Sequence, residues 1–159
     1  MRFSILTATK DRADVLQTAL DSLDAQTFSD WQHLVQDGGA DGASQTLLAR
    51  RSDARRHTER AQDAGLYDAL NTAAQRARGE IVGVLHSDDI YAGPDILASV
   101  SDAFENPSVN VVFGDLDYVS AGASGQVRRR WKAGGFTRSR ARSKASFPTW
   151  NAATARPTA

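Results

Sequence analysis

Apolar residues follow two alternating patterns along this chain: short continuous runs, and longer stretches in which they recur every three or four positions. The continuous runs predict strands, and the recurring pattern predicts amphipathic helices. Strands that alternate with helices favour a mostly parallel central sheet flanked by helices on both faces. The sequence therefore predicts an α/β fold. The predicted strands are residues 2–7, 31–36, 57–60, 81–85 and 109–113, and the predicted helices are residues 13–25, 43–51, 66–78 and 94–104.

Several polar residues and glycines mark where the predicted helices begin and end. Asp11 and Asp41 each precede a helical pattern by two residues and are predicted as N-caps. Gly79 follows the pattern of residues 66–78 and is predicted to end that helix.

The pattern changes towards the C-terminus. Residues 118–120 and 126–131 predict a hairpin around the small and polar residues between them. Residues 132–159 keep neither the strand nor the helix period and are rich in Arg, Ser, Ala and Thr, which predicts an irregular tail. We therefore predict one folded domain over residues 1–131, followed by an irregular basic tail over residues 132–159.

The composition limits the class of protein. The chain has 159 residues, of which 41% are hydrophobic and 24% charged, which suits one soluble domain with its own core. No apolar stretch approaches the roughly 20 residues that a membrane-spanning helix needs, and no signal peptide is evident. The absence of cysteine excludes disulfide, zinc–thiolate and thiol chemistry. These features favour a cytoplasmic protein.

Charge is distributed unevenly although the formal net charge is zero. All 19 acidic residues lie in residues 1–117, and the last 42 residues hold nine basic residues and no acidic one. Such a basic segment can bind nucleic acid or anionic lipid. It can equally be a solvated tail or the phosphate-facing start of a further region. We favour the latter two, and expect no nucleic-acid partner, because the acidic first part would repel polyanions.

The predicted strand at residues 81–85 runs into the adjacent carboxylates Asp88 and Asp89. In open α/β sheets, ligands bind outside the carboxyl ends of the strands. Two neighbouring carboxylates repel each other unless a cation or hydrogen-bond donors offset them. Mg²⁺ and Mn²⁺ are hard cations that suit such a pair together with substrate phosphates. The alternative is a helix cap or a solvated pair.

Two further strand ends are predicted to reach the same edge of the sheet: Thr7 to Thr9, and Asp37 with Gly38 and Gly39. The two glycines permit a tight turn and a close approach of backbone to a ligand. Asp37 could then accept hydrogen bonds from a ribose or a base. On its own, an Asp-Gly-Gly sequence is also compatible with a simple turn.

Seven segments, taken together and in this order, resemble the nucleotide-sugar-binding part of a family 2 glycosyltransferase with the GT-A fold, a Rossmann-like α/β architecture. The resemblance extends over residues 2–131 and rests on the ordered set, since no single segment is specific. The segments are Ser4–Arg12, Gln26–Phe28, Asp37–Gly42, Asp63–Asn71, Gly79–Ile81, His86–Asp89 and Val111–Asp115.

The resemblance implies roles for matching residues. Thr7 and Thr9 would line the nucleotide pocket, and Asp37 would contact the base or ribose. Asp88 and Asp89 match the family's DxD-type metal motif for Mg²⁺ or Mn²⁺, with Asp89 favoured as the direct ligand. Three further residues match positions near the donor: Asp63, Asp68 and Asn71.

The resemblance also implies a reaction. A sugar would pass from a nucleotide-diphosphate donor to an acceptor hydroxyl, on a glycan or a lipid-linked glycan. In an inverting member a carboxylate deprotonates that hydroxyl, while the metal stabilises the diphosphate. Peripheral contact with the cytoplasmic face of a membrane would fit such an acceptor.

The chain departs from the family pattern in two places. His86 stands where Asn or another small polar residue is commoner. No Asp or Glu follows Asp117, whereas the family's catalytic base is an acidic residue of the acceptor-binding region. The catalytic residue is therefore unassigned, and the C-terminus resembles a truncated or frame-shifted end. Two hypotheses stay open: an active transferase with an unusual acceptor side, and an incomplete domain that binds a nucleotide sugar without transferring it.

Overall fold

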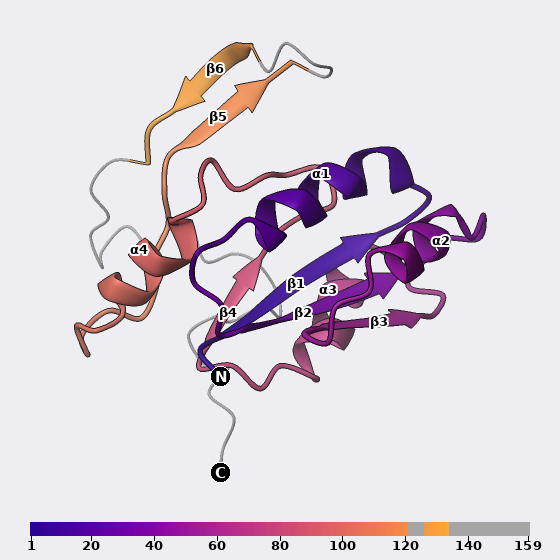
Figure 1. The fold of residues 1–159 in the computed structure, drawn as a ribbon, viewed down its shortest axis with the longest axis horizontal. Coiled ribbons are helices and arrows are strands. Elements are labelled where there is room, and N and C mark those ends of the chain that lie inside the picture. The colour runs from indigo at the N-terminus through magenta and orange to yellow at the C-terminus, as the bar shows by residue number, and fades with distance from the viewer. Residues whose placement is uncertain (121–125, 134–159) are drawn as a thin grey trace.

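The computed structural model describes residues 1–120 and 126–133, which form two sheets and four helices. The main sheet has the strand order β3-β2-β1-β4, with every described pair parallel. A separate antiparallel hairpin lies apart from it (Figure 1). The strands are β1 (Phe3–Thr9), β2 (Trp31–Asp37), β3 (Arg56–Arg60), β4 (Ile81–Val84), β5 (Leu116–Val119) and β6 (Val127–Trp131); the helices are α1 (Ala13–Asp24), α2 (Ala43–Arg50), α3 (Leu66–Ala74) and α4 (Ile96–Ala103).

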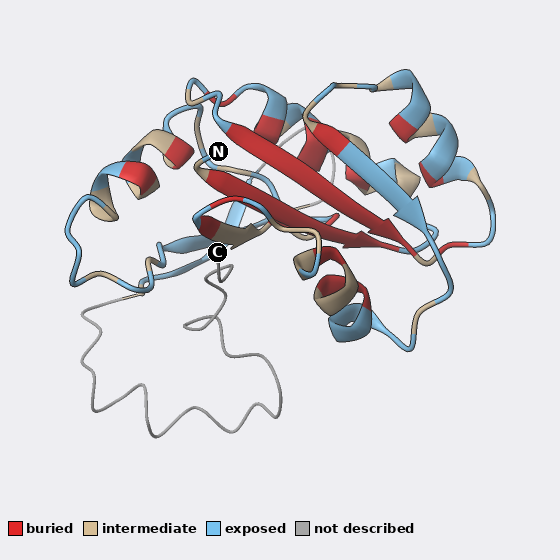
Figure 2. Cartoon of the chain, turned by 90° about the horizontal axis from the view of Figure 1, so that it is seen from below, coloured by how far each residue is buried: buried red, intermediate tan, exposed pale blue. Residues whose placement is uncertain are grey.

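Helices cover both faces of the main sheet, as the sequence predicts. On one face, Leu16 and Leu20 of α1 pack with Val35 of β2 and Leu48 of α2. On the other face, the apolar side of α3 packs against β1 and β2, through a cluster of Leu6, Ala8, Leu34, Ala69, Leu70 and Ala73. The two central strands, β1 and β2, are buried along their whole length, whereas β3 is mostly exposed (Figure 2).

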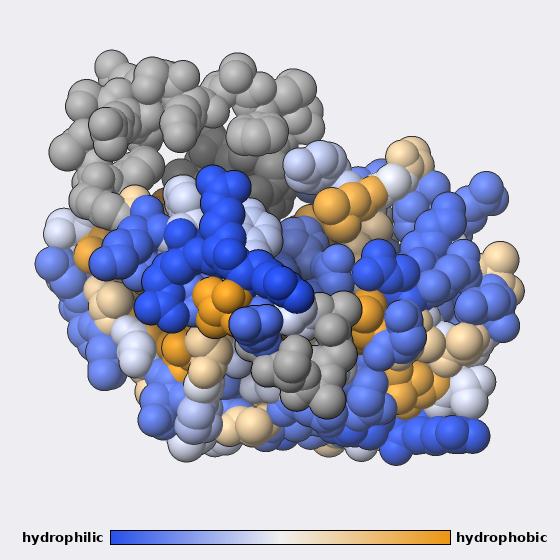
Figure 3. All heavy atoms as spheres, turned by 90° about the horizontal axis from the view of Figure 1, so that it is seen from above, coloured by the Kyte–Doolittle hydropathy of each residue, from blue (hydrophilic) through white to orange (hydrophobic). Residues whose placement is uncertain are grey.

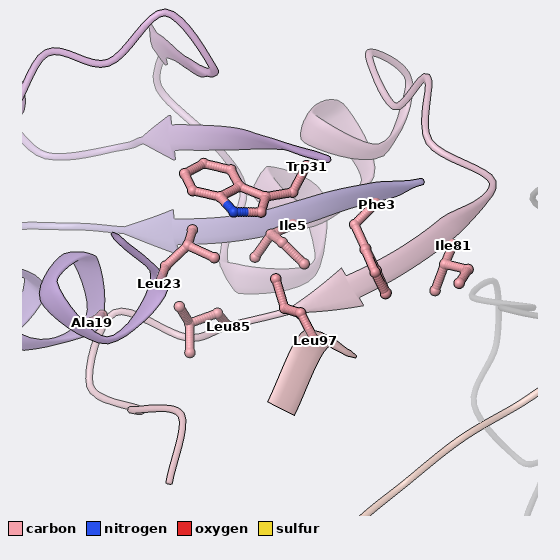
Figure 4. Close-up of a cluster of buried hydrophobic side chains, with 8 residues drawn as sticks. All are labelled: Phe3, Ile5, Ala19, Leu23, Trp31, Ile81, Leu85 and Leu97. Carbon is pink, nitrogen blue, oxygen red and sulfur yellow. The ribbon is translucent and has the colours of Figure 1, made fainter. Parts of the chain in front are cut away.

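The largest cluster of core residues joins the sheet to α1 and α4 (Figure 4). Trp31 is one of its members, and the Arg55 guanidinium stacks over the indole ring at 3.7 Å. Phe3 meets Phe28 edge to face, with ring centroids 5.4 Å apart. These contacts fix the amino-terminal halves of β1 and β2, which run in register from Phe3↔Trp31 to Thr9↔Asp37. The carboxyl ends of these two strands therefore lie side by side.

The predicted strand at residues 109–113 is wrong. These residues form no strand, and Val111 and Phe113 are 54% and 42% exposed. A short apolar run has strand propensity, but a strand forms only where a neighbouring strand pairs with it. β4 is consequently the edge of the described sheet, and Val82 to Val84 are half-buried instead of buried on both faces.

The connection between α3 and β4 differs from the prediction. The helix ends at Ala74, four residues before the predicted end. Gly79 serves another purpose, because a Cβ at this position would overlap the backbone of Phe3 and Ser4. The N–H groups of Arg78 and Gly79 instead donate to Ser4 Oγ, at 3.1 and 2.8 Å.

The hairpin is confirmed, although β5 begins at Leu116 and not at residue 118. Arg130 holds Asp117 across it through two hydrogen bonds, of 2.7 and 2.8 Å. The molecular surface on the side of the hairpin is mainly hydrophilic, with separate hydrophobic groups (Figure 3). Most of the predicted tail, residues 134–159, lies outside the described residues. Among the described residues, no helix has the length and apolarity to cross a membrane.

Candidate functional site

Three loops meet at the carboxyl edge of the sheet, following β1, β2 and β3. Asp37, the last residue of β2, is 2% exposed, and its Oδ1 accepts a hydrogen bond of 2.9 Å from the Gly39 N–H. Asp11, from the loop after β1, accepts from the N–H groups of Ala40 and Asp41 at 2.9 and 3.2 Å. The carboxylates of Asp11 and Asp37 thereby hold the glycine-rich turn from both sides.

Asp11 is not the N-cap of α1, contrary to the sequence prediction. Its backbone is left-handed, with φ of 51°, and its carboxylate bonds the loop after β2 instead of the first turn of α1. The backbone N–H groups of Asp41 and Ala40 lower the pKa of Asp11. Asp41 is not the N-cap of α2 either, because Gly42 takes that position with a left-handed backbone. The Asp41 Oδ1 nevertheless accepts from the N–H of Ala43, the first residue of α2, at 2.9 Å.

The two glycines of this turn are required by close contacts. A Cβ on Gly38 would overlap the Asp63 carboxylate. A Cβ on Gly39 would lie 2.7 Å from Asp11 Oδ1 and 2.9 Å from Asp37 Oδ1. The loop after β3 therefore reaches the turn after β2 through Asp63. A Cβ on Gly38 would displace the Asp63 side chain, whereas a Cβ on Gly39 would also meet the Asp11 backbone nitrogen, at 2.9 Å.

Asp63, Asp68 and Asn71 belong to the entry into α3. Asp63 Oδ1 accepts from the Gly65 N–H, and Asp68 Oδ2 accepts from the Ala64 N–H, both at 3.0 Å. Asp68 is exposed in the first turn, and Asn71 is half-buried one turn later. The structure thus brings Asp63 to the turn after β2, whereas Asp68 contacts this turn only through the loop that it bonds.

The two threonines of β1 are placed differently. Thr7 is fully buried, and its hydroxyl donates to the Leu85 carbonyl oxygen at 2.6 Å. It is therefore engaged inside the fold. Thr9 lies opposite Asp37 in the register, and in the described part of the chain its buried hydroxyl has no hydrogen-bond partner. A buried hydroxyl without a partner is costly, so Thr9 is the better placed of the two to bond a ligand.

Asp88 and Asp89 follow β4 on an exposed turn, closed by a hydrogen bond of 3.1 Å from the Asp89 N–H to the His86 carbonyl oxygen. Partial loss of solvent and the neighbouring Asp88 raise the pKa of Asp89, against an opposing effect of His86. Asp88 forms an ion pair with Arg12, with 3.6 Å between Oδ2 and the guanidinium nitrogen. Positive charge is therefore favourable at this pair of carboxylates.

A divalent cation fits this pair only if other groups complete its coordination. No group of three or more His, Cys, Asp or Glu that could hold a metal occurs in residues 1–120 and 126–133. Mg²⁺ commonly binds through one or two carboxylates, keeps several waters and takes other ligands from substrate phosphates. The paired carboxylates of Asp88 and Asp89 suit that mode of binding and not a closed protein cage.

A cavity of about 430 Å³ opens beside Asp37, between α2 and β3. Its volume is within the range of small-molecule sites. Arg60 lines it and donates to the Gly39 carbonyl oxygen at 2.9 Å, which ties the cavity wall to the glycine turn. Thr9, Asp88 and Asp89 do not line this cavity.

Sequence reasoning missed several residues near these groups. Arg12 pairs with Asp88, and Arg60 lines the cavity. His33 bonds Thr7 and Arg56 in the core. Its position between Trp31 and Val35, in a strand that is buried along its whole length, was the signal that could have identified it.

The sequence profile described as "Glycosyl transferase family 2" matches residues 4–154. The chain belongs to glycosyl transferase family 2. Among curated members, an uncharacterized glycosyltransferase of Mycobacterium tuberculosis is 31% identical over 101 residues, which are 63% of this chain and 38% of that protein. The PGL/p-HBAD biosynthesis glycosyltransferase of Mycobacterium bovis is 34% identical over 119 residues, which are 72% of this chain and 46% of that protein. The chain thus spans less than half the length of these relatives.

Solved structures of TarS from Staphylococcus aureus share the fold. TarS residues 1–349 in complex with UDP-GlcNAc match with a TM-score of 0.64 at 21% identity, over 79% of this chain and 36% of that one. The complex with UDP matches with a TM-score of 0.59 at 22% identity, over 79% and 37%. The α/β fold predicted from the resemblance to family 2 glycosyltransferases is confirmed.

Proposed function

We propose that this domain binds a nucleotide-diphosphate sugar at the carboxyl edge of its parallel sheet, together with Mg²⁺ or Mn²⁺. One observation carries the proposal: the loops after β1, β2 and β3 meet around Gly38 and Gly39, and the chain after β4 presents Asp88 and Asp89. Ligands of open α/β sheets bind at this edge. The family to which the chain belongs, and the UDP and UDP-GlcNAc complexes of TarS, support it.

The chain's own residues divide the work of binding. Asp37 accepts hydrogen bonds from the ribose or base, and Thr9 bonds the same part of the nucleotide. Asp63 holds the turn after β2, while Asp68 and Asn71 lie towards the donor sugar. Asp89, assisted by Asp88, holds the cation. Thr7 is buried and does not contact the ligand; its hydroxyl bonds the Leu85 carbonyl oxygen inside the fold. When bound, such a cation offsets the charge of the departing diphosphate.

The reaction proposed is that of the family, an inverting transfer of the sugar to an acceptor hydroxyl, on a glycan or lipid-linked glycan. A cytoplasmic location and peripheral contact with a membrane stay predictions.

A second candidate function is binding without transfer. Arg130 lowers the pKa of Asp117, which disfavours this carboxylate as a general base. Asp115 accepts a hydrogen bond of 3.0 Å from the Ala133 N–H. These were the acidic residues nearest to the acid-free end of the sequence, and both are engaged within the hairpin region.

Calorimetry with UDP and Mn²⁺ tests the binding site. We expect UDP to bind in the presence of Mn²⁺, and Asp89→Asn to weaken binding about tenfold or more, as expected when a metal ligand is lost. Removing the metal with a chelator should have a similar effect on the wild type. The matched control is Asp102→Asn, which makes the same chemical change on the exposed side of α4 and should leave the affinity unchanged.

Failure of the wild type to bind any nucleoside diphosphate with either cation would refute the proposal. Where binding is found, release of nucleotide diphosphate from a panel of nucleotide sugars decides between the two candidates. Turnover, including hydrolysis, favours the transferase. Binding with no turnover under any acceptor condition favours the domain that only binds.

A further inference from the structure

A line of hydrogen bonds crosses the buried face of the sheet beneath α1. It begins at Asp24, the last residue of α1, whose Oδ1 accepts from Arg56 at 2.6 Å. The Arg56 Nε donates to His33 Nδ1 at 3.0 Å. His33 Nε2 lies 2.9 Å from Thr7 Oγ1, which donates to the Leu85 carbonyl oxygen at 2.6 Å. The line thus joins β3, β2 and β1 to the residue that follows β4.

Only one arrangement of protons satisfies this line. A guanidinium can only donate, so His33 Nδ1 must accept and Nε2 carries the ring proton. Nε2 then donates to Thr7 Oγ1, and the Thr7 hydroxyl proton points to Leu85. Burial, and next the positive charge of Arg56, lower the pKa of His33 to about 3, which keeps the ring in this neutral state.

Three members of the line are closed off from water, whereas Asp24, at which it begins, is exposed. Thr7 is fully buried, His33 is 1% exposed, and the side chain of Arg56 is 2% exposed. A second bond fixes Arg56, whose guanidinium also donates to the Arg51 carbonyl oxygen at 2.6 Å. Since no water can replace a missing partner easily, each side chain depends on the next for its orientation.

The line ends where the candidate metal-binding segment begins. The pairing of β1 with β4 stops at Leu6↔Val84, and the Leu85 N–H donates to the Leu6 carbonyl oxygen at 3.0 Å. Leu85 is therefore held at both its N–H, by Leu6, and its carbonyl oxygen, by Thr7. Asp88 and Asp89 follow three and four residues later.

We infer that Thr7 and His33 are positioning residues for the carboxylates of Asp88 and Asp89, and act on them through the Leu85 carbonyl. They contact neither cation nor nucleotide. They fix the point from which the loop of residues 86–89 leaves the sheet, and this sets the affinity for the cation–nucleotide pair. The identity of the ligand in this inference rests on the proposed function. The positioning of the loop by Thr7 and His33 does not depend on it.

Substitutions at Thr7 separate its hydroxyl from its shape. Thr7→Val keeps the volume and removes the donor, and Thr7→Ser keeps the donor. We expect Thr7→Val to raise the dissociation constant for UDP in the presence of Mn²⁺ about tenfold, as is typical for lost outer-shell partners of metal ligands. Thr7→Ser should stay within about twofold. His33→Gln, whose amide can accept from Arg56 and donate to Thr7, should bind better than His33→Leu.

The control for a merely structural effect is Val35→Ala. Val35 is fully buried on the same face of the sheet, next to His33 on β2, but takes no part in the line. It should lower the stability of the fold without raising the dissociation constant. An equal loss of affinity in Val35→Ala and Thr7→Val, at equal loss of stability, would overturn the inference.

NMR of the ligand-free protein gives a readout that does not depend on binding. Thr7→Val should shift the amide resonances of residues 86–89 and speed hydrogen exchange at the Asp89 N–H, whereas Thr7→Ser and Val35→Ala should not. Unchanged resonances in Thr7→Val overturn the inference even if affinity falls, and shifted resonances with wild-type affinity overturn it as well. If the wild type binds no nucleoside diphosphate, the proposed function fails, and the ligand-free spectra still decide whether Thr7 positions the loop.

Discussion

At the scale of single residues, the candidate site depends on contacts that the spacing of residues in the sequence does not predict. Asp11 is the clearest case, because its left-handed backbone directs the carboxylate away from α1 and onto the turn after β2. A helical pattern preceded by Asp predicts a cap, and nothing in that pattern indicates a positive φ. The glycines at 38 and 39 were recognised as allowing close approach, but the partners that approach them come from loops distant in sequence.

Gly39→Ala tests this close packing. The new Cβ would lie 2.9 Å from the Asp11 backbone nitrogen as well as close to two carboxylates, so backbone must move. We expect a loss of about 1–3 kcal/mol in the free energy of unfolding, as for other overpacked sites, and weaker binding of UDP. Chemical denaturation and calorimetry measure the two effects. Gly93→Ala is the matched control, since no atom lies within 4 Å of its new Cβ; equal behaviour of the two variants would contradict the account.

At the scale of elements, the hydrophobic pattern predicts most of the fold. It identifies β1, β2, β4 and α1 to within two residues, because these elements bury clear apolar faces. It fails at residues 109–113, where strand propensity meets no pairing partner in the described sheet. The sequence likewise does not predict that β4 is an edge strand of the described sheet, because strand pairing depends on the neighbouring segments and not on the apolar residues of the strand alone.

Ser4 links three elements through one buried hydroxyl. Its Oγ accepts from the N–H groups of Arg78 and Gly79 and from the Gln32 side chain, at 3.1, 2.8 and 2.8 Å. Ser4→Ala leaves these donors without their acceptor, and we expect it to lower the free energy of unfolding by about 1–3 kcal/mol. Urea denaturation measures the loss.

The control for Ser4→Ala is Ser99→Ala, which removes only an exposed bond to the preceding turn of α4 and should cost less than about 0.5 kcal/mol. The affinity for UDP should not change in either variant, because Ser4 lies near the amino end of β1, away from Asp88 and Asp89. An effect of Ser4→Ala no larger than that of Ser99→Ala would show that the three donors find other partners.

At the scale of the whole molecule, the polar line beneath α1 is the feature that sequence analysis could not supply. Its members come from α1, β1, β2 and β3, and no pair of them is close in sequence. A strand that reads as Trp-Gln-His-Leu-Val-Gln indicates a buried His, but the partner of that His depends on how the strands are ordered. Because of this line, the stability of the domain depends on whether the His33 imidazole is protonated.

The neutral, buried His33 makes the stability of the domain depend on pH. Its pKa is about 3 in the folded protein and about 6.5 in the unfolded chain, so only the unfolded chain gains a proton between these values. Stability contributed by this group is complete above about pH 6.5 and falls as the pH is lowered, by at most about 1.4 kcal/mol per pH unit. Urea denaturation between about pH 7 and pH 5 measures this slope. His33→Gln should flatten it, while His57→Gln, a change on the exposed strand β3, should keep it. A wild-type slope retained by His33→Gln would mean that other groups produce the pH dependence, and that the buried imidazole accepts a proton without unfolding.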